Sequence, residues 1–114
     1  MKTQHQVILS LGSNLGEKQK NIQLCIALLH QEVGTIAAVS SLYESDAWGF
    51  QSEAFYNCAV MMHTHLKPQK VLKKILKVES KLGRIRSEEE GYQARIIDID
   101  IIVFDDEVLA EEQL

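Results

Sequence analysis

The last strand of this chain is predicted by Arg95-Ile96-Ile97-Asp98-Ile99-Asp100-Ile101-Ile102-Val103, a short apolar run rich in β-branched residues. Two aspartates interrupt the run two positions apart, and on a strand such positions point to the same face, roughly 6–7 Å apart. Neighbouring carboxylates on a sheet face are costly when they are desolvated and unpaired, and magnesium is the oxygen-binding cation that relieves this cost. Asp98 and Asp100 are therefore predicted to hold metal for phosphate chemistry. The alternative is a pair of partly exposed carboxylates on a solvent-facing side of the sheet.

Length and composition indicate one ordinary globular unit. With 114 residues, the chain is expected to form a single domain over residues 1–114. Its hydrophobic share of 46% and charged share of 25% are typical of a soluble protein. The formal net charge of −4 argues against nucleic acid as a partner, so phosphate binding must be local. The N-terminus lacks a signal-peptide core and no apolar stretch could span a bilayer, so no membrane partner is expected.

The two cysteines are predicted to be structural. Cys25 falls on the apolar side of a predicted helix, and Cys58 lies inside a predicted strand. Neither has the spacing of a metal site, so both are expected to be reduced core residues, which indicates a cytoplasmic protein.

The remaining elements follow from hydrophobic periodicity and from the positions of glycine and proline. Strands are predicted at residues 6–11, 35–43 and 55–64, helices at 17–33 and 68–82, and loops at 44–54 and 84–94. Together with the last strand, the order is β-α-β-β-α-β. This order predicts an α+β, ferredoxin-like fold, in which a four-stranded antiparallel sheet carries two helices on one face.

Three arginines bracket the loop and strand that carry the aspartates. Arg84, Arg86 and Arg95 each have a planar fork that suits phosphate oxygens. With metal on the two aspartates, they would form a clamp for a triphosphate. The alternative is weak surface salt bridging with the glutamates at positions 88–90.

Glu79 falls in the apolar register of the second helix, seven residues after Leu72 and four after Ile75. The spacing favours a position at the edge of the apolar stripe, with the stem packed and the carboxylate in water. The other interpretation is a carboxylate placed to accept hydrogen bonds from a ligand.

Two aromatic residues and an amide cluster around the predicted loop that follows the second strand. They are Trp48, Phe55 and Asn57. An aromatic ring beside an amide, which both donates and accepts hydrogen bonds, suits a flat polar heterocycle. Hydrophobic packing of Trp48 and Phe55 is the alternative.

Five blocks of the chain form a recognisable pattern. In chain order they are Leu9-Ser10-Leu11-Gly12-Ser13-Asn14-Leu15-Gly16, Ser40-Ser41-Leu42-Tyr43-Glu44-Ser45 with Trp48-Gly49, Phe55-Tyr56-Asn57, Glu79 with Leu82-Gly83-Arg84-Ile85-Arg86, and the strand from Arg95 to Ile102. Together these blocks resemble 6-hydroxymethyl-7,8-dihydropterin pyrophosphokinase, an enzyme family of folate biosynthesis. The resemblance implies transfer of pyrophosphate from ATP to the hydroxymethyl group of a reduced pterin, with release of AMP.

The resemblance also implies roles for individual residues. Two magnesium ions would lie on Asp98 and Asp100, which would be catalytic together with Arg84 and Arg95. The ATP site would comprise Glu79, Arg84, Arg86, Tyr92 and Arg95, with Tyr92 in place of a family tryptophan. The pterin site would comprise Ser45, Asp46, Trp48, Phe55 and Asn57, with Phe55 stacking on the ring and Asn57 bonding its edge. The expected partners are therefore ATP and the reduced pterin, and the expected state is a monomer, with a dimer as the alternative.

Two departures from the family pattern shape the remaining expectations. Asp46 stands where the family usually has proline, and the chain stops at Leu114. Family members usually continue past the metal strand and supply a histidine, an arginine and a second aromatic residue. We therefore expect one pyrophosphokinase-like domain without that segment. The alternatives are a truncated, inactive module that binds nucleotide or pterin, and a ferredoxin-like interaction domain that associates through sheet edges.

Overall fold

The computed structural model describes residues 4–13, 16–45, 55–87, 92–95 and 97–108. Their elements, in chain order, are β1 His5–Ser13, α1 Lys18–Glu32, β2 Thr35–Val39, β3 Tyr43–Ser45, β4 Phe55–Thr64, α2 Pro68–Lys81, β5 Arg84–Ser87, β6 Tyr92–Arg95, β7 Asp98–Phe104 and β8 Glu107–Val108. Neither helix in this part of the chain is long and apolar enough to cross a membrane.

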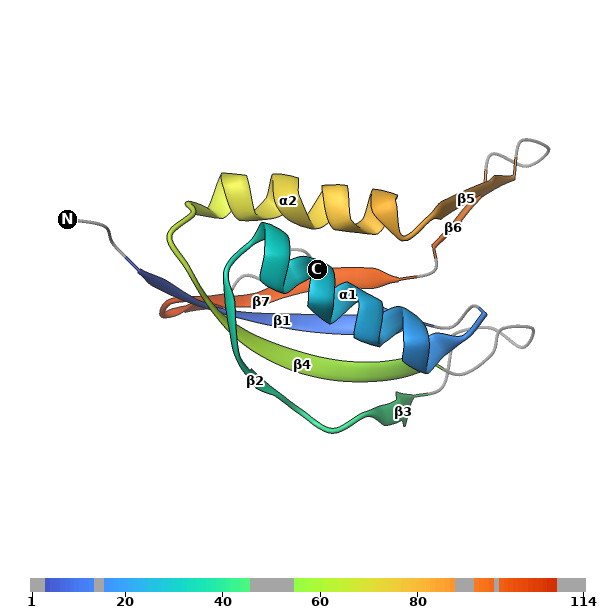
Figure 1. The fold of residues 1–114 in the computed structure, drawn as a ribbon, viewed down its shortest axis with the longest axis horizontal. Coiled ribbons are helices and arrows are strands. Elements are labelled where there is room, and N and C mark those ends of the chain that lie inside the picture. The colour runs from blue at the N-terminus through green and yellow to red at the C-terminus, as the bar shows by residue number, and fades with distance from the viewer. Residues whose placement is uncertain (1–3, 14–15, 46–54, 88–91, 96, 109–114) are drawn as a thin grey trace.

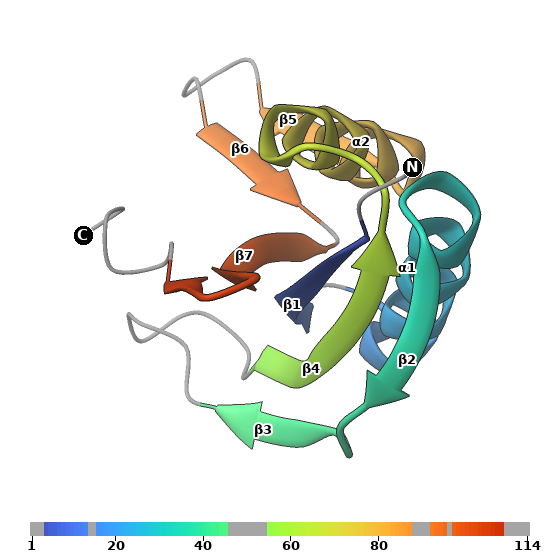
Figure 2. The same cartoon turned by 90° about the vertical axis from the view of Figure 1, so that its left-hand side faces the viewer.

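One antiparallel sheet forms the centre of the molecule. Its strands run in the order β2-β4-β1-β7-β8, and β3 pairs with β4 beyond the end of β2. Both helices cover the same face of this sheet (Figures 1 and 2). The predicted α+β, ferredoxin-like arrangement is confirmed, with β2, β4, β1 and β7 as its four principal strands.

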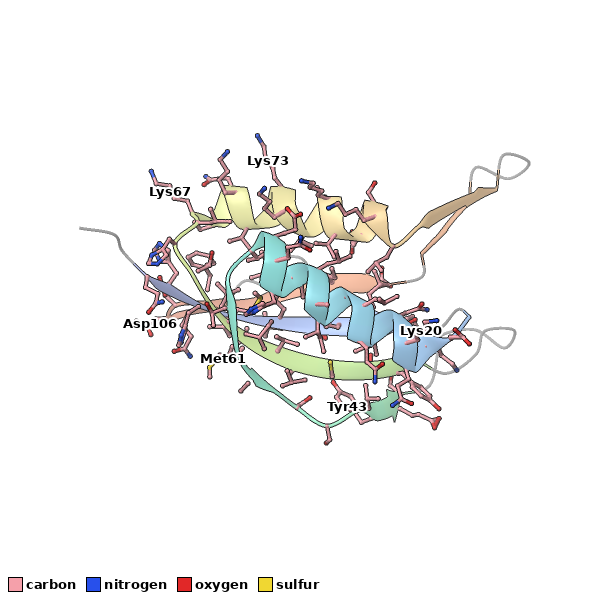
Figure 3. The ribbon with its side chains drawn as sticks, viewed as in Figure 1. Lys20, Tyr43, Met61, Lys67, Lys73 and Asp106 are labelled. Carbon is pink, nitrogen blue, oxygen red and sulfur yellow. The ribbon has the colours of Figure 1, made fainter. Side chains whose placement is uncertain are left out.

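Strand alternation separates the two faces of the sheet. Side chains directed toward the helices form one buried cluster, whose members include Val7, Leu9, Leu11, Cys58, Val60, Met62 and, from the helices, Ile22, Leu29, Val71 and Ile75. Lys67 and Lys73 lie at the outer side of α2 and point away from the sheet (Figure 3). The core therefore occupies the space between sheet and helices, and the opposite face remains available for polar chemistry.

Both cysteines are free and belong to the core, as predicted. Burial, followed by the neighbouring Cys58 and Glu79, raises the pKa of the Cys25 thiol to about 12. Burial also raises the pKa of Cys58. Both groups are therefore neutral thiols at physiological pH.

The predicted second strand is divided in two. β2 ends at Val39 and β3 begins at Tyr43, where a continuous strand over 35–43 was expected. Between them, the Ser40 N–H donates to the Ala59 carbonyl at 2.9 Å, and the Ala59 N–H donates to Ser40 Oγ at 2.8 Å. The serine hydroxyl replaces a backbone acceptor, so the chain can bend and still remain bonded to β4.

The predicted loop at 84–94 was wrong, because it contains a hairpin. β5 pairs with β6, and this pair forms a separate two-stranded sheet. The hairpin follows α2 directly and projects beyond the end of the main sheet at which β7 begins (Figure 1). Arg95 consequently ends β6, whereas the last strand was expected to begin at this residue.

Candidate functional site

A row of residues crosses the sheet at the end where β1 finishes and β4 and β7 begin. Gly12 of β1 pairs with Asn57 of β4 on one side and with Asp98 of β7 on the other, and Tyr43 of β3 pairs with Asn57. Neighbouring strands lie about 4.8 Å apart. The register therefore places a residue expected at the pterin site and one expected at the metal site roughly two strand spacings apart.

The two aspartates lie on the face of the sheet away from the helices. Asp98 is partly buried and Asp100 is exposed, whereas Ile97 and Ile99 are buried in the core. The described residues contain no group of three or more side chains that could enclose a metal ion. Two carboxylates on an accessible face suit Mg²⁺, which commonly takes one or two protein carboxylates and completes its shell with water and substrate phosphate oxygens. The donor set therefore fits the predicted ion.

Asn57 is held in place by neighbouring strands. Its Nδ2 donates to Ser45 Oγ at 2.8 Å and lies 3.4 Å from the Phe55 carbonyl oxygen and 3.5 Å from that of Tyr43. Its Oδ1 points toward Gly12, where a Cβ atom would lie 3.1 Å from it. Phe55 is also beside Gly12, at 3.4 Å from that Cβ position. The structure thus brings Ser45, Phe55 and Asn57 together, while Asp46 and Trp48 lie outside the described residues.

The arginines expected at the phosphates lie on the hairpin. Arg84 pairs with Arg95 across its base, Arg86 pairs with Gln93, and Ser87 pairs with Tyr92. The backbone register therefore brings Arg84 and Arg95 opposite each other, and Arg95 lies three residues before Asp98. The roles of these side chains remain predictions.

Glu79 differs from its expected place at a wet edge. The side chain is 3% exposed, and Oε2 accepts a hydrogen bond from the Ile99 N–H at 3.0 Å. Ile99 lies on β7 between the two aspartates. The prediction of a solvated carboxylate was wrong because β7 approaches this face of α2 and provides a buried donor.

Sequence reasoning missed Gly12 as a residue of the site. The glycine-containing segment was expected to end the first strand at residue 11, but β1 continues to Ser13 and Gly12 is buried within it. A glycine inside an apolar strand pattern often marks a close approach of other groups. Gly12 directly follows such a pattern, so the sequence did contain a signal for it. Tyr43 belongs to one of the blocks that resemble the family, but its pairing with Asn57 follows only from the register between β3 and β4.

Comparisons with known proteins place the chain among proteins of one family. Residues 8–113 match the model of a family described as 7,8-dihydro-6-hydroxymethylpterin-pyrophosphokinase (HPPK). Two relatives carry the name 2-amino-4-hydroxy-6-hydroxymethyldihydropteridine pyrophosphokinase. The one from Bacillus subtilis is 39% identical over 108 residues, and the alignment covers 93% of this chain and 64% of the relative. The one from Aquifex aeolicus is 41% identical over 109 residues, covering 95% of this chain and 66% of the relative.

Solved structures support the same fold. Wild-type HPPK-DHPS from Plasmodium falciparum, crystallised with pteroate, superposes with a TM-score of 0.68 at 17% identity and covers 92% of this chain and 30% of that chain. A triple mutant of the same protein superposes with a TM-score of 0.70 at 16% identity. At such identities the likeness concerns the fold alone. The chain spans about two thirds of the length of its bacterial relatives.

Proposed function

Because the chain belongs to the 7,8-dihydro-6-hydroxymethylpterin-pyrophosphokinase family, we propose that it transfers pyrophosphate from ATP to 6-hydroxymethyl-7,8-dihydropterin in folate biosynthesis. The pterin hydroxyl oxygen forms a new bond to the β-phosphorus of ATP. The bond from that phosphorus to the α,β-bridging oxygen breaks, AMP leaves, and the hydroxyl proton is lost. The bacterial relatives bear the name of this activity. Residues 1–114 would act as one pyrophosphokinase-like domain.

The observation that carries the proposal is the row formed by Asn57, Gly12 and Asp98. A reaction between two bound substrates is accelerated when their reacting atoms are held close together and aligned. In this row, the group suited to a pterin edge and the carboxylates suited to a phosphate-bound metal share one face of the sheet. Such an arrangement would bring the pterin hydroxyl to the β-phosphorus of the nucleotide.

The pterin would be held by Phe55 and Asn57. The Asn57 amide is oriented by its bond to Ser45 Oγ, so its carbonyl oxygen is directed toward Gly12 and can accept from a ring N–H. The Phe55 ring beside Gly12 offers a surface for stacking on a flat heterocycle. Asp46 and Trp48 would complete this pocket.

Asp98 and Asp100 would hold magnesium, for which we propose two ions together with the triphosphate of ATP. When bound, magnesium supplies charge neutralisation and orientation of the phosphate oxygens. Arg84 and Arg95, opposite each other at the base of the hairpin, would add positive charge to the triphosphate, with Arg86 and Tyr92 further along the same hairpin. Catalysis would thus depend on positioning and electrostatics, without a covalent intermediate.

The two free, buried thiols support the cytoplasm as the site of action. ATP and the reduced pterin would be the partners, and the working form would be a monomer.

The test is AMP formation from ATP and 6-hydroxymethyl-7,8-dihydropterin in the presence of Mg²⁺. Replacing either aspartate, as Asp98→Asn or Asp100→Asn, should reduce kcat/KM by about 10²–10³-fold, because the charge stabilising the transferred group is lost. Asp106→Asn, an exposed aspartate in the turn after β7, should leave the rate unchanged.

Absence of AMP at high protein concentration would refute the proposed activity for this chain. Calorimetric binding of the pterin without turnover would then identify a binding module. Absence of binding to both substrates would favour an interaction domain.

A further inference from the structure

Glu79 is a buried side chain with a formal charge, at 3% exposure. A buried carboxylate is costly unless it accepts hydrogen bonds. Here Oε2 accepts from the backbone N–H of Ile99 at 3.0 Å. Ile99 is the single residue between Asp98 and Asp100 on β7.

The Ile99 N–H lies at an edge of β7 that no described strand covers. β7 pairs with β1 along one side, while on its other side β8 pairs only with Val103 and Phe104. Alternate residues of an antiparallel strand direct their N–H groups to opposite edges. Because the Ile99 N–H bonds to Glu79, it points away from β1, and α2 supplies an acceptor on the side where no described strand lies.

The bond therefore restrains the backbone at the point that sets the spacing of two like charges. Carboxylates at two neighbouring positions on one face of a strand repel each other, and a cation bound between them relieves the repulsion. A strand with an open edge can relieve such repulsion by twisting or bulging. A hydrogen bond to a charged acceptor resists that distortion more strongly than one to a neutral acceptor.

We propose that Glu79 is a positioning residue, whose carboxylate fixes β7 through the Ile99 amide so that Asp98 and Asp100 present their oxygens together to metal-bound nucleotide. Its role in catalysis rests on the proposed function. In this role the carboxylate acts on the strand, whereas the family resemblance suggested a contact with ATP.

Two substitutions at Glu79 distinguish a positioning role from a direct contact with ATP. Glu79→Gln retains an acceptor for the Ile99 N–H, and Glu79→Leu removes it at similar size. The first readout is hydrogen–deuterium exchange of the Ile99 amide relative to the amides of the β1–β4 ladder. The second is the affinity for Mn²⁺ in the presence of α,β-methylene ATP, followed by the kcat and KM of AMP formation.

In the leucine variant, we expect Ile99 exchange to accelerate at least tenfold relative to the ladder and Mn²⁺ affinity to fall by about 10–100-fold, as is typical when a group supporting metal ligands is lost. The glutamine variant should keep Ile99 protected and retain most of the affinity and kcat. Leu29→Ala, a buried α1 residue, is the control for general loss of stability, and it should change neither the relative protection of Ile99 nor the metal affinity.

The proposal is overturned if the leucine variant keeps Ile99 protected, or if it loses that protection without losing metal affinity. It is also overturned if the glutamine variant loses metal affinity as strongly as leucine does while Ile99 stays protected, because the charge would then act on the ligand. Should the leucine variant not fold, the wild-type protein decides: an Ile99 amide that exchanges like an open strand edge refutes the proposal. Amide exchange and Mn²⁺ affinity do not require turnover. A wild-type chain that binds Mn²⁺ but forms no AMP would therefore refute the proposed activity and leave the positioning role of Glu79 standing.

Discussion

Gly12 is the residue at which the two halves of the proposed site meet. It pairs with Asn57 and with Asp98, and it carries no side chain between them. A Cβ atom at this position would lie 3.1 Å from Asn57 Oδ1 and 3.4 Å from Phe55 Cδ1. The first of these contacts is too close for an undisturbed amide, so a side chain here would displace the group expected to orient the pterin.

Gly12→Ala should therefore raise the KM for the pterin by about tenfold, which corresponds to roughly 1.4 kcal/mol. The KM for ATP should change much less, because the obstruction lies on the Asn57 side of the row. Steady-state kinetics with each substrate varied in turn checks this expectation.

Gly16→Ala is the matched control. Gly16 has φ = 65° and no atom within 4 Å of a Cβ at its position, so alanine there should cost about 1–2 kcal/mol of folding stability through backbone strain alone. An equal effect of both substitutions on the pterin KM would contradict the assigned role of Gly12.

At the level of the helices and strands, the sequence was informative wherever an apolar face was buried. The helix from Lys18 to Glu32, the helix from Pro68 to Lys81 and β4 follow their predicted ranges closely, because each buries a periodic stripe in the core. The β5–β6 hairpin was missed because its short strands, at Arg84–Ser87 and Tyr92–Arg95, are largely polar and carry no apolar periodicity. Long-range pairing, rather than local pattern, defines such elements.

The same limit applies to the candidate site. Asp98 and Asp100 could be recognised because two charges interrupt an apolar strand. The bond from Ile99 to Glu79 could not, since it joins residues twenty positions apart in the chain and depends on how α2 lies over β7. Similarly, no local pattern sets Gly12 opposite Asn57.

The contact between the two helices includes a charged cluster that should make the free energy of unfolding depend on pH in the acid range. Glu32, at the end of α1, lies 3.1 Å from Lys81 Nζ, 3.3 Å from Lys77 Nζ and 3.5 Å from Lys74 Nζ, all on α2. Hydrogen bonds from Lys81 and then Lys77 lower the pKa of Glu32 from 4.5 to about 2. The folded state therefore binds fewer protons than the unfolded state between these pH values.

This contribution to stability is present above pH 4.5 and should be lost as the pH falls toward 2. Glu32→Gln should flatten that part of the acid transition, measured as the free energy of unfolding in urea at several pH values. Glu17→Gln removes an exposed carboxylate that lies 3.8 Å from Lys20 Nζ, and it should leave the transition unchanged. An acid dependence that is identical in wild type and Glu32→Gln would show that the cluster does not contribute.

For the molecule as a whole, the proposed substrates would bind the face of the sheet opposite the helices. Ligands that span β3, β4, β1 and β7 should therefore stabilise the entire fold without disturbing the core. At a hundredfold excess over Kd, a ligand that binds only the folded state adds about 2.7 kcal/mol, which should raise Tm by roughly 10 °C.

Differential scanning fluorimetry with magnesium and α,β-methylene ATP checks this expectation. The shift should disappear when both aspartates are replaced in the double variant Asp98→Asn with Asp100→Asn. A shift of equal size in the double variant would locate nucleotide binding elsewhere on the molecule.

The alternation along β7 has a consequence for how the length of this chain can change. Asp98 and Asp100 face outward because Ile97 and Ile99 face the core. Inserting or deleting one residue between Ile97 and Ile101, where the pairing with β1 is regular, would exchange the two sets, so the core would receive carboxylates and the outer face would receive isoleucines. Single-residue insertions and deletions should therefore prevent folding at residues 97–101 and be better tolerated near Ile102, where the pairing of β7 with β1 already shifts by one residue.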